Sequence, residues 1–179
     1  MTTAVAFLFE SYVAVRDFLE LGGPVLKVIV VAIFLLWTLI LERGIYLRRR
    51  LPVVVREVVA TWEAREDHGS WRAQRIREML ISRLAEDAGM SIPFIKTLVA
   101  ICPLLGLLGT VTGMIEIFDV LAISGSGTAR SMADGVARAT VTTMAGMVGA
   151  LSGVFASSIL ARAAAREVQK FDERLRLDS

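Results

Sequence analysis

The stretch PLLGLLGTVTGMIEIF, residues 103–118, decides the fold together with GVARATVTTMAGMVGALSG, residues 135–153. Both stretches are apolar and rich in glycine, and both carry threonines where a purely lipid-facing helix would carry only apolar side chains. Polar side chains inside a membrane helix mark a pathway or a helix interface more often than decoration. The two stretches therefore predict membrane helices that pack closely, conduct, or do both.

The chain as a whole is apolar enough for a membrane protein, with 55% hydrophobic residues and a mean hydropathy of +0.61. Residues 25–41 are interrupted only by Lys27, and residues 97–115 and 139–161 carry no charge. A helix needs about 20 residues to span the hydrocarbon core. We therefore expect an all-α integral membrane protein whose three transmembrane helices cover residues 24–47, 94–122 and 134–162.

The distribution of charge predicts the orientation of these spans. Acids outnumber bases in residues 1–24, whereas bases outnumber acids in residues 42–96 and include three consecutive arginines, 48–50. The positive-inside rule then places the N-terminus outside and the C-terminus inside. The remaining segments are expected to be a periplasmic amphipathic helix (1–22), long cytoplasmic helical extensions (48–93), a periplasmic loop (123–133) and a cytoplasmic tail (163–179). A frayed extension is the alternative for the first of these.

The inventory of reactive residues argues against an enzyme. Cys102 is the only cysteine, so an intrachain disulfide or a cysteine-based zinc site is excluded, and the only histidine, His68, falls in the expected cytoplasmic segment. There is no H-E-x-x-H motif and no phosphate-binding loop. We expect no metal and no cofactor. The net charge is only +2, and the basic residues are scattered among acidic ones, so nucleic acid is not an expected partner.

Glycines form a stripe on each of the two polar helices. At about 100° per residue they fall to one side of Thr110 in the first stretch and of Thr143 in the second. Each stripe contains a small-x-x-x-small pair, which lets two backbones approach closely in lipid. We therefore expect these glycines to pack helices together. The glycines of the two stripes are Gly106, Gly109, Gly113, Gly146, Gly149 and Gly153.

The threonines beside these stripes are candidates for a proton pathway. Thr110, Thr140 and Thr143 belong to a cluster that is denser than packing needs. A hydroxyl both donates and accepts, so it can hold a file of water or relay a proton without carrying charge. The alternative is that each hydroxyl only bonds a carbonyl of its own helix.

Two charges flank the polar helices. Glu116 closes the first stretch and Arg138 opens the second, both near the expected outer face. We expect them to pair, or one of them to meet a partner protein; two interfacial anchors are the alternative. No carboxylate lies in the middle of a span, so the chain alone has no obvious proton carrier at the midplane.

The motif P-L-L-G-L-L-G-T-V-x-G-M, followed by the second glycine- and threonine-bearing helix, resembles the MotA/TolQ/ExbB proton-channel family and is most like ExbB. The resemblance covers about residues 90–165. Many ExbB and TolQ proteins carry a glutamate early in the third span, where this chain has Arg138. That departure argues against a proton role at this position, and it resembles the ExbB variants of accessory TonB systems.

The resemblance implies a function that spacing alone does not indicate. Such proteins lie in the inner membrane of Gram-negative bacteria, as homo-oligomers, typically pentamers, around the single transmembrane helices of ExbD. They use the proton motive force to energise TonB, which drives transport across the outer membrane. The pore-lining threonines would be Thr110 and Thr143, and the proton-carrying aspartate would come from ExbD. The alternatives are a TolQ-like subunit of the Tol-Pal system and a membrane scaffold without conduction.

Overall fold

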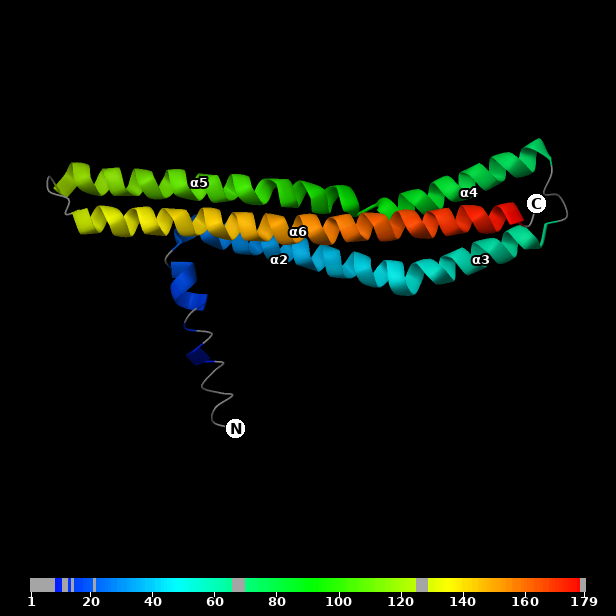
Figure 1. Ribbon diagram of the computed structural model, residues 1–179, viewed down its shortest axis with the longest axis horizontal. Helices are drawn as coiled ribbons and strands as arrows, with labels where there is room; N and C mark the ends of the chain where they lie inside the picture. Colours follow the sequence, from blue (N-terminus) through cyan, green and yellow to red (C-terminus); the bar gives the residue numbers. More distant parts are fainter. Residues whose placement is uncertain are drawn as a thin grey trace. The chain divides into compact units, whose positions relative to one another are not determined.

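The computed structural model describes residues 9–10, 13, 15–20, 22–65, 70–124 and 129–177. All regular structure in these ranges is helical (Figure 1). The elements are α2 (Gly23–Ile45), the π-helical turn η1 (Tyr46–Arg50), α3 (Leu51–Glu63), α4 (Trp71–Gly89), α5 (Ile92–Ser124) and α6 (Ala129–Leu177).

Three helical runs are long and apolar enough to cross a membrane. Among the described residues they cover Gly23–Glu63, Trp71–Ile123 and Gly135–Leu175; the first two contain an expected span, and the third contains all but the first residue of its span. The expectation of an all-helical chain with three long apolar helices is confirmed.

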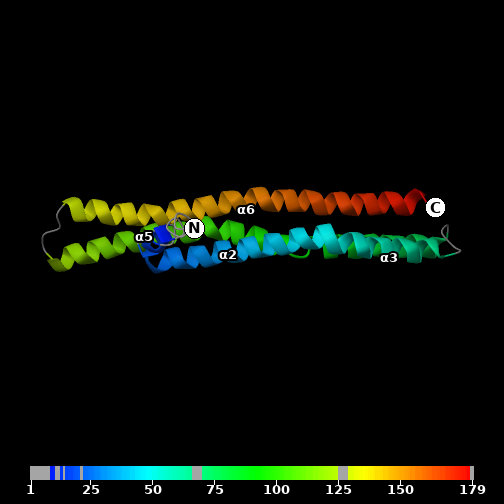
Figure 2. The ribbon, with the colours of Figure 1, turned by 90° about the horizontal axis from the view of Figure 1, so that it is seen from below.

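The chain divides into two compact units, and the first contains both polar helices. It comprises Met1–Leu35 and Leu98–Ser152, that is, the start of α2, most of α5 and the first half of α6. Within it, α5 and α6 lie side by side and antiparallel in both ribbon views (Figures 1 and 2). The buried side chains of this unit are mostly apolar or small: Leu26, Ile29, Cys102, Ala139, Thr142 and Ala150.

The connection between α5 and α6 is shorter than the sequence predicted, because both helices extend into the segment that was expected to be a loop. Helix α5 continues to Ser124 and α6 begins at Ala129, so much of the segment expected as a loop, 123–133, is helical. The first residues of α6 include alanine, arginine and methionine, which are strong helix formers and extend the helix ahead of the apolar region.

The second unit comprises Leu36–Thr97 and Gly153–Ser179. Its helix α4 begins where the Ser70 hydroxyl accepts a hydrogen bond from the Ala73 N–H, at 3.2 Å. That helix ends at Gly89, and α5 begins at Ile92 just before Pro93; glycine and proline commonly mark such helix boundaries. The core of this unit is apolar and includes Leu36, Leu51, Trp62, Ile95, Phe171 and Leu175.

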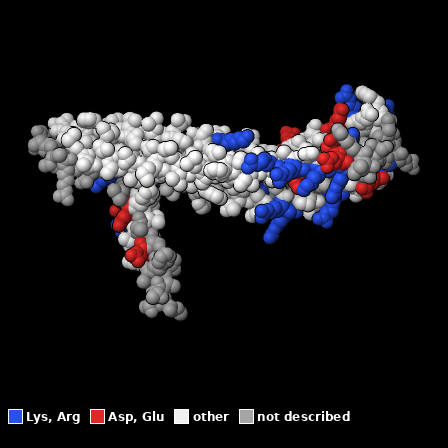
Figure 3. Space-filling model, viewed as in Figure 1, with Lys and Arg blue, Asp and Glu red and all other residues white. Residues whose placement is uncertain are grey.

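Charged side chains are concentrated on the second unit. On the face drawn in Figure 3, lysine and arginine cover parts of its surface, whereas the surface of the α5–α6 pair is almost free of charge. Arg77 of α4 also forms a part-buried ion pair with Asp172 of α6. The charged part of this unit is therefore suited to contact with water, and the helix pair to contact with lipid.

Candidate channel-lining helix pair

The backbones of α5 and α6 meet at glycines. A Cβ atom at Gly106 would lie 3.0 Å from the Cα of Thr143 and 3.2 Å from the carbonyl oxygen of Thr142. A Cβ at Gly146 would lie 2.5 Å from the carbonyl oxygen of Cys102. The obstructing atoms belong to the backbone and cannot turn aside, so only glycine fits here without separating the helices.

The remaining glycines of the stripes have different neighbours. A Cβ at Gly109 would collide with the side chain of Thr142, and one at Gly113 would lie 2.9 Å from the Cβ of Ala139. Gly149 instead faces α2, where a Cβ would lie 2.6 Å from the side chain of Ile33. Gly153 is buried in the second unit. The small-x-x-x-small pair of α5 therefore packs against a threonine and an alanine of α6.

Two threonines of α6 share one carbonyl of α5. The Thr143 hydroxyl donates to the Gly106 carbonyl oxygen at 3.0 Å. The Thr142 hydroxyl lies 2.7 Å from the carbonyl oxygen of Ala139 in its own helix and 3.4 Å from the Gly106 oxygen. Thr142 is buried, with 2% of its surface exposed, whereas Thr143 lies at the edge of the contact. The hydroxyls thus tie the two helices together where the backbones are closest.

The other two candidate threonines bond their own helices. Thr110 is half-buried and donates to the Leu107 carbonyl at 2.7 Å, and Thr140 is exposed and donates to the Ala137 carbonyl at 2.8 Å. This is the local bond that the alternative interpretation anticipated. Each hydroxyl oxygen keeps acceptor capacity toward water. Of the three candidates, only Thr143 has its hydroxyl engaged by the neighbouring helix.

Glu116 and Arg138 line one cavity of about 400 Å³ in the first unit, together with Glu20 and Thr112. Both side chains are exposed, and among the described residues no ion pair joins them. Glu20 is bound to Arg16 instead, at 2.8 Å, and this partner raises the pKa of the arginine. The pairing of Glu116 with Arg138 stays a prediction.

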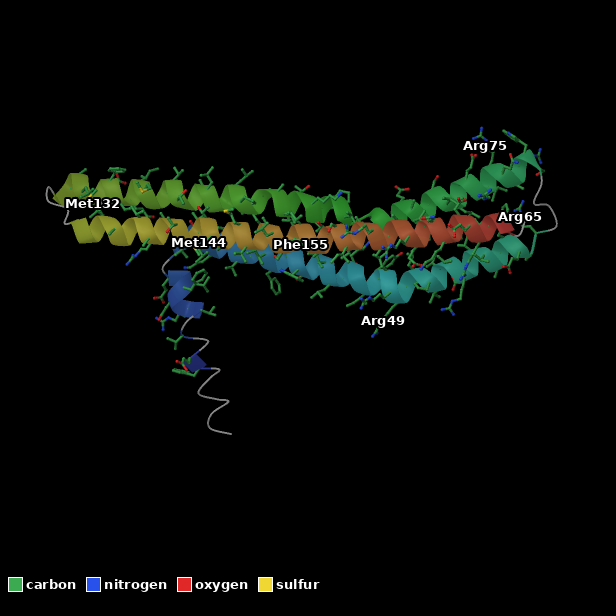
Figure 4. All side chains as sticks on the ribbon, in the orientation of Figure 1. Arg49, Arg65, Arg75, Met132, Met144 and Phe155 are labelled. Atoms are coloured by element: carbon green, nitrogen blue, oxygen red, sulfur yellow. The ribbon has the colours of Figure 1, made fainter. Side chains whose placement is uncertain are left out.

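The outer surface of α6 is apolar. Met144, 66% exposed, and Phe155, 69% exposed, can both be found on α6 in Figure 4. Met147 and Leu151 are also exposed. A single chain therefore presents a lipid-like surface beside Thr140, which suits contact with lipid or with other apolar helices.

For two residues, the structural role was not predicted from the sequence. Thr142 lies on the glycine stripe, four residues before Gly146, so the helical period could have identified it as a contact residue. Arg43 is 2% exposed, and its Cζ lies 4.6 Å from the centre of the Tyr46 ring. Its Nε and Nη2 atoms have no hydrogen-bond partner among the described residues. No sequence pattern marks this arginine as buried.

The chemistry available along the helix pair is that of neutral dipoles. Hydroxyls and carbonyls line it, and no charged residue occurs within 98–115 of α5 or 139–152 of α6. In the described part of the chain, no cluster of three or more His, Cys, Asp or Glu side chains could hold a metal ion. Such a surface can order water and pass hydrogen bonds, but it offers no acidic or basic side chain of its own to carry a proton.

These features define an α-helical membrane protein built on a glycine-packed helix pair with hydroxyls at its edge. The pattern of the MotA/TolQ/ExbB proton channel family matches residues 49–173, and the chain belongs to this family. The match is longer than the segment on which the sequence resemblance rested. It is a family of channel and transport proteins, not a class of enzymes.

Individual relatives fall in both the ExbB and the TolQ branches. The chain is similar to the ExbB-like 1 protein of Synechocystis sp. The two are 30% identical over an alignment of 203 positions, which covers 96% of this chain and 80% of that protein. It is 45% identical to biopolymer transport protein exbB1 of Vibrio cholerae over 76 residues, or 42% of this chain and 33% of the relative. It is 36% identical to TolQ of Pseudomonas aeruginosa over 88 residues, 49% of this chain and 37% of the relative.

Proposed function

We propose that this chain is the channel-forming subunit of an ExbB-type motor, which uses the proton motive force to energise TonB-dependent transport across the outer membrane. In this proposal the protein lies in the bacterial inner membrane with its N-terminus outside and its C-terminus inside. Several copies, a pentamer by analogy with the family, enclose the transmembrane helices of an ExbD-like partner. Family membership and the ExbB names of two relatives support this choice.

One observation carries the mechanism: the α5–α6 pair is closed by glycines and carries hydroxyls at its edge, but residues 98–115 of α5 and 139–152 of α6 include no acidic or basic side chain. Gly106 and Gly146 fix the two backbones against each other, and Thr143 lies at the border of that contact. A surface of this kind can guide protons through water and hydroxyls, but a proton carrier must come from another chain. A single-span partner with a membrane-embedded carboxylate would supply it.

In the proposed cycle, protons enter from the periplasmic side and pass Thr110, Thr140 and Thr143. They then protonate the carboxylate of the partner transiently, and this neutralisation lets the partner helices move within the ring. The buried charge would otherwise be costly to move through an apolar lumen. TonB-like proteins receive the resulting force.

The decisive experiment is proton flux in liposomes that contain the chain together with its single-span partner. Replacement of Thr143 by valine keeps the shape of the side chain and removes the hydroxyl. We expect T143V to lower flux to the level of liposomes without the partner, while the complex still assembles. The variant T143S, which keeps a hydroxyl, is expected to conduct.

Thr142→Val is the matched control. It removes a neighbouring hydroxyl that approaches the same Gly106 carbonyl, but from a side chain that is 2% exposed. We expect T142V to conduct like the wild type. If T143V conducts equally well, the role of Thr143 is wrong; if the wild-type complex conducts nothing, the chain is a scaffold.

A TolQ-like function is the second candidate, because TolQ proteins of Pseudomonas aeruginosa and Haemophilus influenzae are 36% and 30% identical to parts of this chain. The two functions differ in their partners. Co-purification of an ExbD-like protein and TonB would favour the first, and co-purification of TolR- and TolA-like proteins the second.

A further inference from the structure

A groove of about 540 Å³ lies between the end of α2 and α6, within the second unit. Its lining is apolar along most of its length, with buried Ile40, Leu47 and Leu160 and exposed Leu41 and Ile159. At one end the lining changes to Arg48 and Arg49. An apolar channel that ends in two cations has the chemical layout of an anionic phospholipid, with its acyl chain beside its phosphate.

Gly44 keeps this groove open. A Cβ at Gly44 would meet nothing within 4 Å, in contrast to the crowded glycines of the α5–α6 contact. Glycine inside a helix costs about 0.5–1 kcal/mol relative to alanine, so helix packing gives no reason for it at this position. The open space above Gly44 is part of the groove. The absence of a side chain at this position leaves room for an occupant of the groove.

The positive charge at the end of the groove is uncompensated. Arg48 and Arg49 are exposed, and neither forms an ion pair within the described ranges; Arg49 is labelled on the turn after α2 in Figure 4. Arg43, one turn earlier, adds a buried guanidinium with two unpartnered nitrogens. No acidic residue occurs among the described residues that line the groove. An anion at this end would be attracted by Arg48 and Arg49, which line it.

The depth of the site also fits a phosphate. Helix α2 has 23 residues, so it is about 35 Å long, slightly more than the hydrocarbon thickness of about 30 Å. The arginines follow in η1, immediately after the span. Lipid phosphates lie at this level of the membrane whichever way the chain crosses it. The apolar part of the groove then lies at the depth of the acyl chains.

We propose that this groove is a binding site for one anionic phospholipid, whose phosphate is held by Arg48 and Arg49 and whose acyl chain lies over Gly44. The site does not depend on proton conduction. It uses the charge of the headgroup for selectivity and the apolar walls for affinity.

The test uses the full chain in bilayers of equal parts phosphatidylcholine and phosphatidylglycerol. Each lipid is supplied in turn with a photoreactive group on its acyl chain, and labelled peptides are mapped by mass spectrometry. We expect phosphatidylglycerol to label the α2 and α6 segments that line the groove in preference to phosphatidylcholine. The R48Q/R49Q variant should lower this labelling by about 5-fold for each arginine removed.

R56Q/R65Q is the matched control, because it removes the same charge from exposed positions outside the groove. We expect it to be labelled like the wild type. Gly44→Leu fills the groove without a backbone clash and should abolish labelling by both lipids. Proton flux is expected to be unaffected by R48Q/R49Q, so the two proposals can fail separately.

Three results would overturn the site. They are equal labelling of the groove by the two lipids in the wild type, unchanged labelling in Gly44→Leu, and cross-links that join the groove to a second copy of the chain. The last result would make the groove a contact between subunits.

Discussion

Two of the contacts that α6 makes along its length solve the same packing problem in different ways. In the first unit it meets α5 through glycines, with a Cβ at Gly146 only 2.5 Å from a backbone oxygen. In the second unit it meets α4 through the ion pair of Asp172 with Arg77, next to a groove lined largely by alanines such as Ala88 and Ala164. The first contact depends on close approach of two backbones, and the second on an ion pair beside small apolar side chains.

Lipid is as apolar as a leucine side chain, so burial of apolar surface cannot hold two helices together there. Close backbone approach and hydroxyl–carbonyl bonds remain available, and the α5–α6 pair uses both. In water, burial of apolar surface stabilises a contact, and charged side chains can stay at its rim. The α4–α6 contact of the second unit has both features. The comparison predicts that the two contacts respond to different perturbations.

The largest effect is expected from Gly146→Leu. The new side chain would collide with the Cys102 carbonyl and with Gly106, both in the backbone of α5. Overpacking of a tight contact costs about 1–3 kcal/mol, occasionally more, and we expect the upper end because no obstructing atom can rotate away. The free energy of unfolding is measured by denaturant titration of the chain in detergent micelles.

Gly44→Leu is the control for that experiment, since it makes the same substitution in a helix where a Cβ meets nothing within 4 Å. It should leave the stability unchanged or raise it by about 0.5–1 kcal/mol. Similar losses at the two positions would show that glycine content, not contact geometry, governs stability.

A smaller effect is expected from the ion pair. The side chains of Arg77 and Asp172 are 23% and 29% exposed, so water screens their attraction in part. We expect R77Q to lower the free energy of unfolding by about 1 kcal/mol, and the reversed pair R77D/D172R to recover part of the loss. The loss should shrink in concentrated salt, whereas that of Gly146→Leu should not. A salt-independent loss for R77Q would remove the distinction between the contacts.

The smallest effect is expected from Thr142→Val. Valine keeps the shape that packs against Gly109 and removes the hydroxyl that lies 3.4 Å from the Gly106 carbonyl oxygen of α5 and 2.7 Å from the Ala139 carbonyl oxygen of its own helix. Hydrogen bonds between membrane helices contribute about 0.6 kcal/mol on average, so the expected loss is of that size. A loss as large as that of Gly146→Leu would mean that hydroxyl bonding, and not close approach, dominates the α5–α6 contact.

The three spans and the glycine stripes could be predicted from the sequence because both signals are local. Apolar length identifies a span, and the helical period groups Gly106 with Gly109 and Gly113. The direction of a hydroxyl is not a local property. Thr140 and Thr143 look alike in the sequence, but only Thr143 comes opposite a carbonyl of another helix.

Glycines illustrate the same limit. Gly44 and Gly146 each occupy a helix, and nothing in their immediate neighbours shows that one borders open space and the other a backbone. Arg43 is a similar case, since an arginine near the end of a span normally extends its side chain to the membrane surface, yet this side chain is buried. These features depend on which surface lies opposite, and that is decided by tertiary packing.

The glycine contact has a consequence for the biogenesis of the protein. Helices α5 and α6 follow each other closely in the chain, and glycines of each helix pack against the other helix of the same polypeptide. We therefore expect the two to enter the bilayer as one helical hairpin and to pair before they meet any other chain. Oligomers would then assemble from hairpins that have already formed. A substitution at Gly146 that prevents pairing of the two helices would therefore expose the chain to proteolysis before it assembles.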